Sequence, residues 1–250
     1  MKLQMLKRAL ISYVTNSAKA IWSAIAHPLS IVSSKECNVK DYRIYGGSTE
    51  VSSIPITVRG KNLLDVNKVY PAYVNGEGGI TFTRSALANL YNNTNMYDKY
   101  KEKTQYTFSC DYETTLDNNA VYPYVLYTDG SNQRFYQTLY SEGTGSFSGH
   151  CAVTTTANKT VSKIAFLYST VARTCDVKLT NMQLEEGATA SEYEAYIEPQ
   201  TIDISRTLGA GEVIQKSVDG LPNLPQYKGT TVYEVQTDTP PSGIEVCYYE

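Results

Sequence analysis

The sequence predicts a mainly β protein: a β-sandwich or jelly roll with an N-terminal amphipathic α-helix and a small C-terminal β element. Apolar and polar residues alternate along several segments, most regularly where Tyr106, Phe108 and Cys110 share one face of a strand. Residues 121–140 are predicted to form a β-hairpin around Asp129-Gly130, a pair typical of tight hairpin turns. Tyr is also unusually common, at 22 of 250 residues, and strands favour it.

Residues 1–27 are predicted to form the N-terminal helix. Its apolar stripe repeats close to the helical period and consists of Leu3, Leu6, Leu10, Val14, Ile21 and Ile25. Pro28 ends the helix, because the residue before a proline is disfavoured in the α region. Three partners for the stripe stay open. They are copies of this chain or another protein, the chain's own β domain, and a membrane surface, which the basic residues and Trp22 would suit.

The remaining residues are expected to divide into three segments. Residues 28–60 are predicted to be an extended connector with short strands, and residues 61–198 to be the β-sandwich. Turns rich in Gly, Asn, Thr and Ser separate the strands of this sandwich at typical spacings. Residues 199–250 are predicted to form the C-terminal β element, whose strands are separated by Asp219-Gly220 and by prolines.

Composition excludes several classes of protein. The formal net charge of −3 argues against a nucleic-acid-binding role. No apolar run is long enough to span a bilayer, so a membrane protein is not expected. The N-terminal apolar run breaks at Thr15-Asn16-Ser17 and at Lys19, a poor match to a signal peptide, so this segment is expected to stay in the mature protein.

The cysteine count is odd, and no pair has the C-x-x-C spacing. The five residues are Cys37, Cys110, Cys151, Cys175 and Cys247. Buried free thiols are the simplest interpretation, which suits a reducing cytoplasm. A disulfide that joins Cys110 to Cys151 or to Cys175 stays open.

The sequence offers little material for a catalytic or metal site, and no cofactor is expected. His27 and His150 are the only histidines, and neither lies near a second plausible ligand. Glu185-Glu186 suggests a glycosidase pair, but neighbouring strand residues point to opposite faces, so a solvated turn is the better interpretation. Oxygen ligands for a structural Ca²⁺ would have to come from residues without EF-hand-like spacing, namely Asp65, Asp111, Asp176 and Glu185.

The better candidate site is a surface of the predicted hairpin. A glycan needs aromatic rings for its C–H faces and polar groups for its hydroxyls. The hairpin is predicted to supply both, because Tyr127, Arg134 and Tyr136 are expected to share one face near the loop that contains Asp129 and Asn132. The competing interpretation is that this Tyr-rich surface packs on a neighbouring subunit or on the second sheet.

Several segments resemble parts of bacteriophage tail and minor structural proteins, from phages of Gram-positive bacteria. Lys61-Asn-Leu-Leu-Asp65 resembles the entry to their β-sandwich module, and Tyr42-Arg-Ile-Tyr-Gly46 resembles the strand that precedes it. Asn181 to Tyr196 resembles the last strand and exit of the module. Residues 227–249 resemble a C-terminal element of the same proteins. Such modules resemble carbohydrate-binding jelly rolls, and the family has no catalytic residues to carry over.

The resemblance implies a virion structural protein of the tail, baseplate or fibre, assembled in the host cytoplasm. Its partners would be other virion proteins, further copies of itself and glycan on the host surface. Among the homo-oligomers a trimer is favoured. The helix would dock the chain on the particle, while the sandwich contributes to attachment. The alternative is an architectural adaptor or head-fibre subunit without glycan binding, and a glycan-degrading enzyme fits least well.

Overall fold

The protein is mainly β, with 47% strand and 7% helix, and its strands form several antiparallel sheets, which confirms the mainly β part of the prediction. The computed structural model describes residues 21–23, 30–33, 41–86, 90, 93–117, 123–135, 144–166, 176–235 and 243–247. No helix among these residues has the length and apolar composition that crossing a membrane requires.

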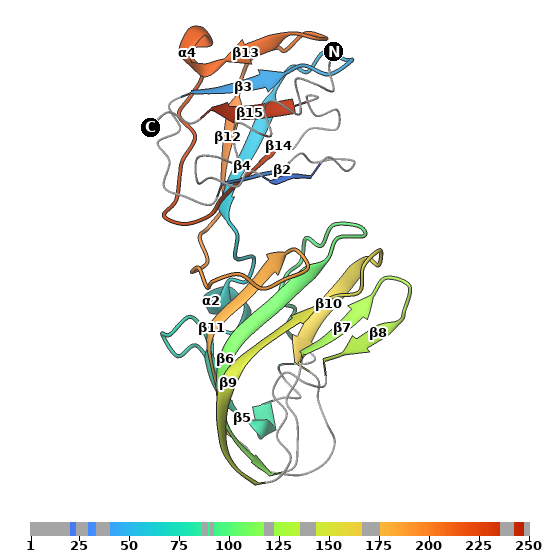
Figure 1. Cartoon of the computed structure of the whole chain (residues 1–250), viewed down its shortest axis with the longest axis vertical. Coiled ribbons are helices and arrows are strands. Elements are labelled where there is room, and N and C mark those ends of the chain that lie inside the picture. Colours follow the sequence, from blue (N-terminus) through green and yellow to red (C-terminus); the bar gives the residue numbers. More distant parts are fainter. Residues whose placement is uncertain are drawn as a thin grey trace. The chain divides into compact units, whose positions relative to one another are not determined.

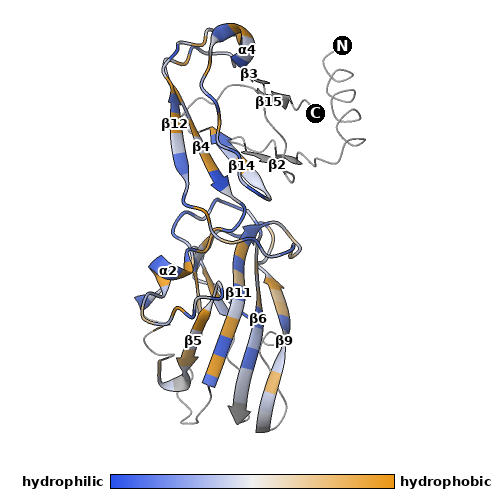
Figure 2. Cartoon of the chain, turned by 90° about the vertical axis from the view of Figure 1, so that its left-hand side faces the viewer, coloured by the Kyte–Doolittle hydropathy of each residue, from blue (hydrophilic) through white to orange (hydrophobic). Residues whose placement is uncertain are grey.

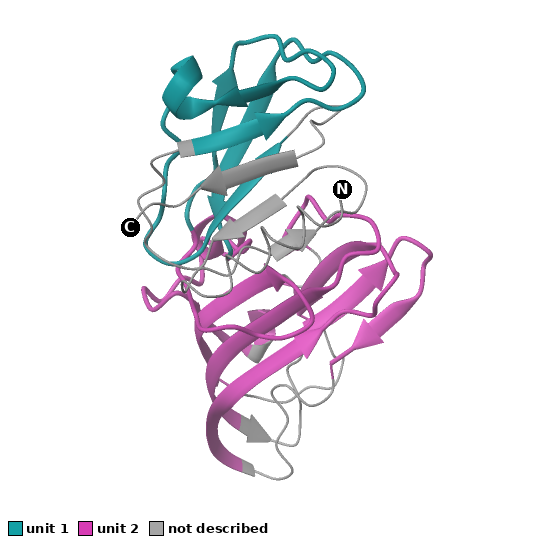
Figure 3. Cartoon of the chain, turned by 45° about the horizontal axis from the view of Figure 1, so that its top comes forward, with its two compact units in different colours: residues 1–61, 197–250 teal, residues 62–196 magenta. Residues whose placement is uncertain are grey.

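The chain folds into two compact units, which Figure 3 distinguishes by colour. Unit 2, Asn62–Tyr196, lies within two residues of the predicted sandwich boundaries. Unit 1 combines Met1–Lys61 with Ile197–Glu250, so unit 2 is inserted into it. The expected connector at 28–60 and C-terminal element at 199–250 are therefore not separate segments, because their strands pair with one another.

Unit 1 contains two sheets. The five-stranded sheet has the order β1 (Ile21–Ser23), β2 (Ser30–Ser33), β14 (Thr231–Val235), β4 (Ile54–Gly60) and β12 (Gln200–Ile204). The three-stranded sheet has the order β13 (Val213–Gln215), β3 (Asp41–Tyr45) and β15 (Gly243–Cys247), and the short helix α4 (Lys216–Asp219) follows β13 (Figure 1). Tyr42 and Ile44 of β3 share one core with Ile56 of β4 and Tyr233 of β14.

The predicted N-terminal helix is wrong at its C-terminal end. Ile21 lies in β1, where it pairs antiparallel with Val32 of β2. β-branched and aromatic residues such as Ile21, Trp22 and Ile31 favour strands, which explains the local preference. The rest of the predicted stripe lies outside the described residues, namely Leu3, Leu6, Leu10, Val14 and Ile25.

Unit 2 contains two sheets that share one core. The four-stranded sheet has the order β5 (Ile80–Thr83), β11 (Asp176–Glu186), β6 (Tyr106–Asp117) and β9 (Thr144–Thr154). The three-stranded sheet has the order β10 (Val161–Phe166), β7 (Pro123–Tyr127) and β8 (Asn132–Arg134). A helical turn, α2 (Val66–Val69), and a 3₁₀ turn, η1 (Arg84–Ala86), precede β6.

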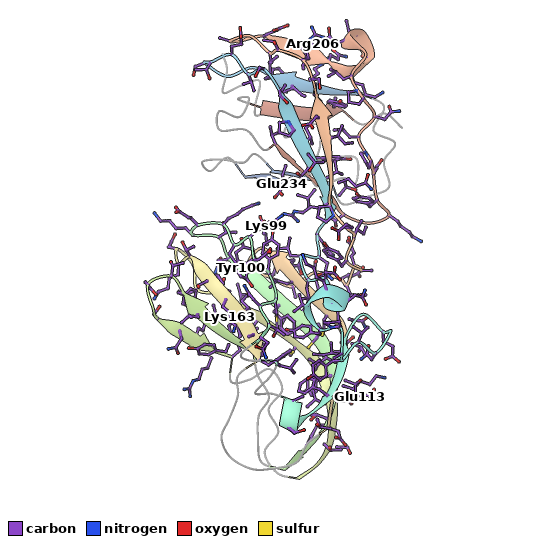
Figure 4. The ribbon with its side chains drawn as sticks, turned by 180° about the vertical axis from the view of Figure 1, so that it is seen from behind. Lys99, Tyr100, Glu113, Lys163, Arg206 and Glu234 are labelled. Atoms are coloured by element: carbon purple, nitrogen blue, oxygen red, sulfur yellow. The ribbon has the colours of Figure 1, made fainter. Side chains whose placement is uncertain are left out.

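Phe166 joins the two sheets of unit 2. Its ring centroid, on β10, lies 5.8 Å from that of Phe82 on β5 and 6.3 Å from that of Phe108 on β6. A second aromatic group closes the core where Tyr100 meets Tyr106 edge to face at 5.0 Å (Figure 4 labels Tyr100). The two sheets therefore pack face to face.

The predicted alternation along β6 is confirmed for its inner face, where Tyr106, Phe108 and Cys110 are buried. Figure 2 shows the same banding of apolar and polar residues along β11. Thr107 and Ser109 on the outer face are also buried, which alternation alone does not predict. The Thr107 hydroxyl donates a hydrogen bond to the Gly187 carbonyl at 2.8 Å, so the segment that follows β11 covers this part of the sheet.

Candidate functional site

The predicted hairpin exists, but its faces are not those predicted. β7 pairs with β8 so that Tyr124 lies opposite Arg134 and Leu126 lies opposite Asn132. Cross-strand partners share a face, so Arg134 and Asn132 lie on the side of Tyr124, not of Tyr127. The prediction that Tyr127 and Arg134 share a face is therefore wrong.

Tyr127 belongs to the core instead. It is only 3% exposed and clusters with Val125 and Phe135. Its hydroxyl donates a hydrogen bond to Gln133 and accepts one from the backbone N–H of Thr156 at 2.8 Å. A ring held this way has no free face on which a sugar can stack, so Tyr127 does not act as the predicted stacking ring.

Asp129 is fixed within the hairpin turn. Its carboxylate accepts hydrogen bonds from the Ser131 backbone N–H at 2.9 Å and the Ser131 hydroxyl at 2.5 Å. The Lys159 ammonium lies 2.9 Å from the same carboxylate and 5.3 Å from the centroid of the Tyr127 ring. Gly130 adopts a φ of +80°, a conformation that glycine tolerates without strain. Asp129 thus organises the turn with most of its hydrogen-bonding capacity in use.

The contacts of Asp129 in this turn predict a lowered pKa for its carboxyl group, which can be tested. The hydrogen bond from the Ser131 hydroxyl, then the one from the Lys159 ammonium, and then the one from the Ser131 backbone N–H lower the pKa of Asp129 from 3.8 to about 2. These contacts therefore persist above the ordinary pKa and are lost as the pH falls towards 2. Ser131→Ala removes the largest of these contacts, and Lys159→Ala removes a hydrogen bond together with a neighbouring charge, so each is expected to raise the pKa of Asp129 towards 3.8 in an NMR titration of the side-chain carboxyl. A variant in which the pKa of Asp129 stays near 2 would contradict the corresponding contact.

The outward face of the hairpin retains a polar and aromatic surface. Asn132 and Arg134 are exposed, and Tyr124 is half-buried beside them. Of the five predicted glycan-contacting residues, the structure places Asn132 and Arg134 on this face, Asp129 in the adjoining turn and Tyr127 in the core. Tyr136 lies outside the described residues. Tyr124 replaces Tyr127 as the ring on this surface, and counting residues from the correct turn would have found it.

The carboxylates considered for catalysis or calcium do not gather. Glu185 is buried and accepts hydrogen bonds from the Ser191 hydroxyl at 2.6 Å and from Gln183 at 2.8 Å. Glu186 pairs with Lys101 at 2.8 Å. Both glutamates belong to β11, so the predicted solvated turn is wrong. Asp65 caps α2. No group of three or more metal-ligating side chains occurs among the described residues.

An exposed polar cluster lies on the outer face of the four-stranded sheet. The Asp111 carboxylate accepts a hydrogen bond from the Asn181 amide at 2.7 Å and lies 3.1 Å from Nδ1 of His150. The Asn181 hydrogen bond, followed by His150, lowers the pKa of Asp111. Asn181 has a φ of +50° at a β-bulge between β11 and β6, which turns its amide towards Asp111.

Asn62 joins the two ends of unit 2, and sequence reasoning assigned it no role. Its amide group donates to the carbonyls of Met182 at 3.1 Å and Glu194 at 3.0 Å. Its amide oxygen accepts from the backbone N–H groups of Leu64 at 3.0 Å and Leu184 at 3.1 Å. Asn62 is 3% exposed, and three of the four hydrogen bonds are buried, while the one to Glu194 is partly buried. The entry and exit segments of the unit are therefore bonded to one side chain.

Cys110 and Cys151 are free thiols opposite each other on β6 and β9. Both are buried, and their sulfur atoms lie 3.3 Å apart. Contact with Cys151 and burial raise the pKa of the Cys110 thiol. This pair matches the simplest interpretation of the sequence, and the other three cysteines have no described side chains.

Comparison with known proteins yields no relative. No protein-family model matches the chain, and no curated protein or solved structure is significantly similar to it. The structure by itself therefore defines the class: a mainly β chain in which one unit is inserted into another.

Proposed function

We propose that this chain is a structural protein of a phage virion, whose unit 2 is a jelly roll of carbohydrate-binding type that contributes to attachment to the host surface. The observation that carries the proposal is the junction at Asn62. The Lys61–Asp65 segment and the Asn181–Tyr196 segment carry the resemblance to phage structural proteins, and Asn62 hydrogen-bonds one to the other. Motifs that resemble the entry and exit of one module would be expected to meet in this way.

The connectivity of the chain also supports a module with a dedicated binding role. The connections to unit 2 leave unit 1 from β4 and β12, which are neighbouring antiparallel strands with Val58 opposite Gln200. An insertion of this kind leaves the surface loops of unit 2 free to vary without disturbing unit 1. The segment that precedes β1 would dock the chain on other virion proteins or on its own copies.

The proposed glycan surface is the outward face of the hairpin. Tyr124 offers an aromatic ring, while Arg134 and Asn132 offer hydrogen-bond donors and an amide oxygen for sugar hydroxyls. This assignment keeps Asn132 and Arg134 from the sequence prediction, with Asp129 holding the turn beside them. It describes a binding role, without a reaction.

An architectural role without glycan binding is the second candidate. The observation that favours it is the burial of Tyr127, which removes one of the aromatic rings that the sequence predicted at the hairpin surface. A subunit of this kind would be incorporated into particles and would ignore cell walls.

A pull-down with purified Gram-positive cell walls separates the two roles. The full chain is expected to co-sediment with the walls, and Tyr124→Ala and Arg134→Ala are each expected to weaken binding about tenfold, since single contacts are worth about 1–2 kcal/mol. Tyr193→Ala is the matched control, because Tyr193 is 37% exposed and belongs to the segment after β11. Absence of wall and glycan binding, together with immunogold labelling of the particle, would leave only the architectural role; no label on particles would refute both.

A further inference from the structure

β9 is a long strand at the edge of the four-stranded sheet (Figure 2). Its eleven residues pair with β6 on one side, and no other described strand pairs with it. Its sequence, Thr-Gly-Ser-Phe-Ser-Gly-His-Cys-Ala-Val-Thr, contains no proline and no Lys, Arg, Asp or Glu. Edge strands of soluble proteins usually carry such residues to prevent pairing with another chain. β9 lacks that protection.

Only the C-terminal end of β9 is shielded. The side-chain amide of Gln133 donates to the Thr154 carbonyl at 3.3 Å, and the Thr155 N–H turns back to the Tyr106 carbonyl at 2.9 Å. From Gly145 to His150 the residues are exposed, apart from Phe147, which packs partly against the core. Beyond this stretch Ala152 is also exposed, so the longest exposed part of β9 in the described chain is Gly145 to His150.

This stretch reads the same in both directions. Gly145-Ser-Phe-Ser-Gly149 is a palindrome centred on Phe147. When two such strands pair antiparallel about a twofold axis at Phe147, each Gly meets a Gly, Ser146 meets Ser148, and Phe147 meets its own copy. Serine pairs and aromatic pairs are favourable cross-strand neighbours. Without formal charge at these positions, the pairing meets no like-charge repulsion.

We propose that β9 is a self-association edge, at which two copies of this chain join their four-stranded sheets through antiparallel β9–β9 pairing centred on Phe147. The two Phe147 rings, each packed against the core of its own copy, meet across the axis. The backbone N–H and C=O groups along the free edge of one β9 strand hydrogen-bond to those of the other. This twofold contact does not depend on the proposed function, nor on the threefold association expected of residues 1–27.

Paired charge variants test the edge. Ser146→Lys/Ser148→Lys places lysines opposite lysines across the axis, and Ser146→Glu/Ser148→Glu places glutamates opposite glutamates. In sedimentation velocity each full-length variant is expected at half the mass of the wild-type assembly, with at least tenfold weaker association. An equimolar mixture of the two is expected to recover the wild-type mass. Both serines are exposed, but Ser148 lies opposite Glu113 of β6 in the same chain. The lysine variant is therefore expected to keep the wild-type unfolding temperature and the glutamate variant to unfold at a slightly lower temperature, with one cooperative thermal transition in each to confirm folding.

Thr81→Lys/Thr83→Lys is the matched control, because it puts two lysines on exposed positions of β5, the opposite edge of the same sheet. It is expected to keep the wild-type mass. Three results would each overturn the proposal. They are a wild-type protein that does not associate, a Ser146→Lys/Ser148→Lys variant with the wild-type mass, and a mixture that does not recover the wild-type mass. Phe147→Cys tests the register: oxidation should link residue 147 to residue 147 of the second copy, and a linked pair at other positions would refute the centre.

Discussion

Phe166→Ala is expected to destabilise unit 2 by about 3–5 kcal/mol, as for other buried phenylalanines truncated to alanine. The Phe166 side chain is fully buried, and its ring contacts aromatic rings contributed by both β5 and β6. Tyr70, at 6.2 Å between ring centroids, adds a third neighbour after helix α2. Removing this ring would leave a cavity between the two sheets. Urea unfolding followed by circular dichroism measures the loss, with each transition fitted separately because the chain has two units.

Phe166→Leu is the control for that experiment. It preserves most of the apolar volume, and its expected cost is below about 1.5 kcal/mol. If Phe166→Ala and Phe166→Leu unfolded at the same urea concentration, Phe166 would not join the sheets as described.

Asn62→Ala carries the second large expected effect, about 3 kcal/mol of lost stability. The substitution leaves two buried backbone N–H groups and two carbonyls without their partner, and each unsatisfied buried group costs about 1–3 kcal/mol before relaxation and water entry reduce the sum. Amide hydrogen exchange is expected to accelerate at Leu64 and Leu184, whose N–H groups bond to Asn62.

Asn67→Ala provides the comparison. Asn67 lies in α2, and its side chain is exposed. Its replacement should change stability by no more than about 0.5 kcal/mol, since exposed positions away from special contacts tolerate substitution. Equal losses in the two variants would show that the buried amide of Asn62 is not what joins the segments.

The hairpin shows what sequence reasoning can reach. The Asp129-Gly130 pair located the turn correctly, but the predicted faces require a two-residue turn. The Tyr127 N–H instead bonds to the Ser131 carbonyl, which leaves a three-residue loop that Gly130 closes with its positive φ. One additional loop residue shifts the register by one and reverses the faces. Tyr127 therefore lies in the core and Tyr124 on the outward face, the reverse of the predicted arrangement.

Other differences arise from pairings between distant parts of the sequence. The alternation of Tyr106 to Cys110 is local, and it predicted the inner face of β6 correctly. The pairing of β4 with β12 and β14 joins residues more than 140 positions apart, as in Thr57 opposite Thr201. No local pattern encodes such a partner, so the segment before residue 61 was predicted to be a connector. Asn62 escaped notice for the same reason, because three of its four partners come from residues 182–194.

The insertion has a consequence for the order of events during synthesis. Unit 2 is continuous in sequence, so it can fold as soon as Glu194 has left the ribosome and reached Asn62. β3 and β4 emerge earlier, yet β12, β13, β14 and β15, which pair with them, are translated last. The nascent chain must therefore hold these two strands unpaired, with Ile44, Ile56 and other residues of the later core uncovered, until their partners have been translated. During that interval β3 and β4 are the segments that a chaperone would have most reason to protect.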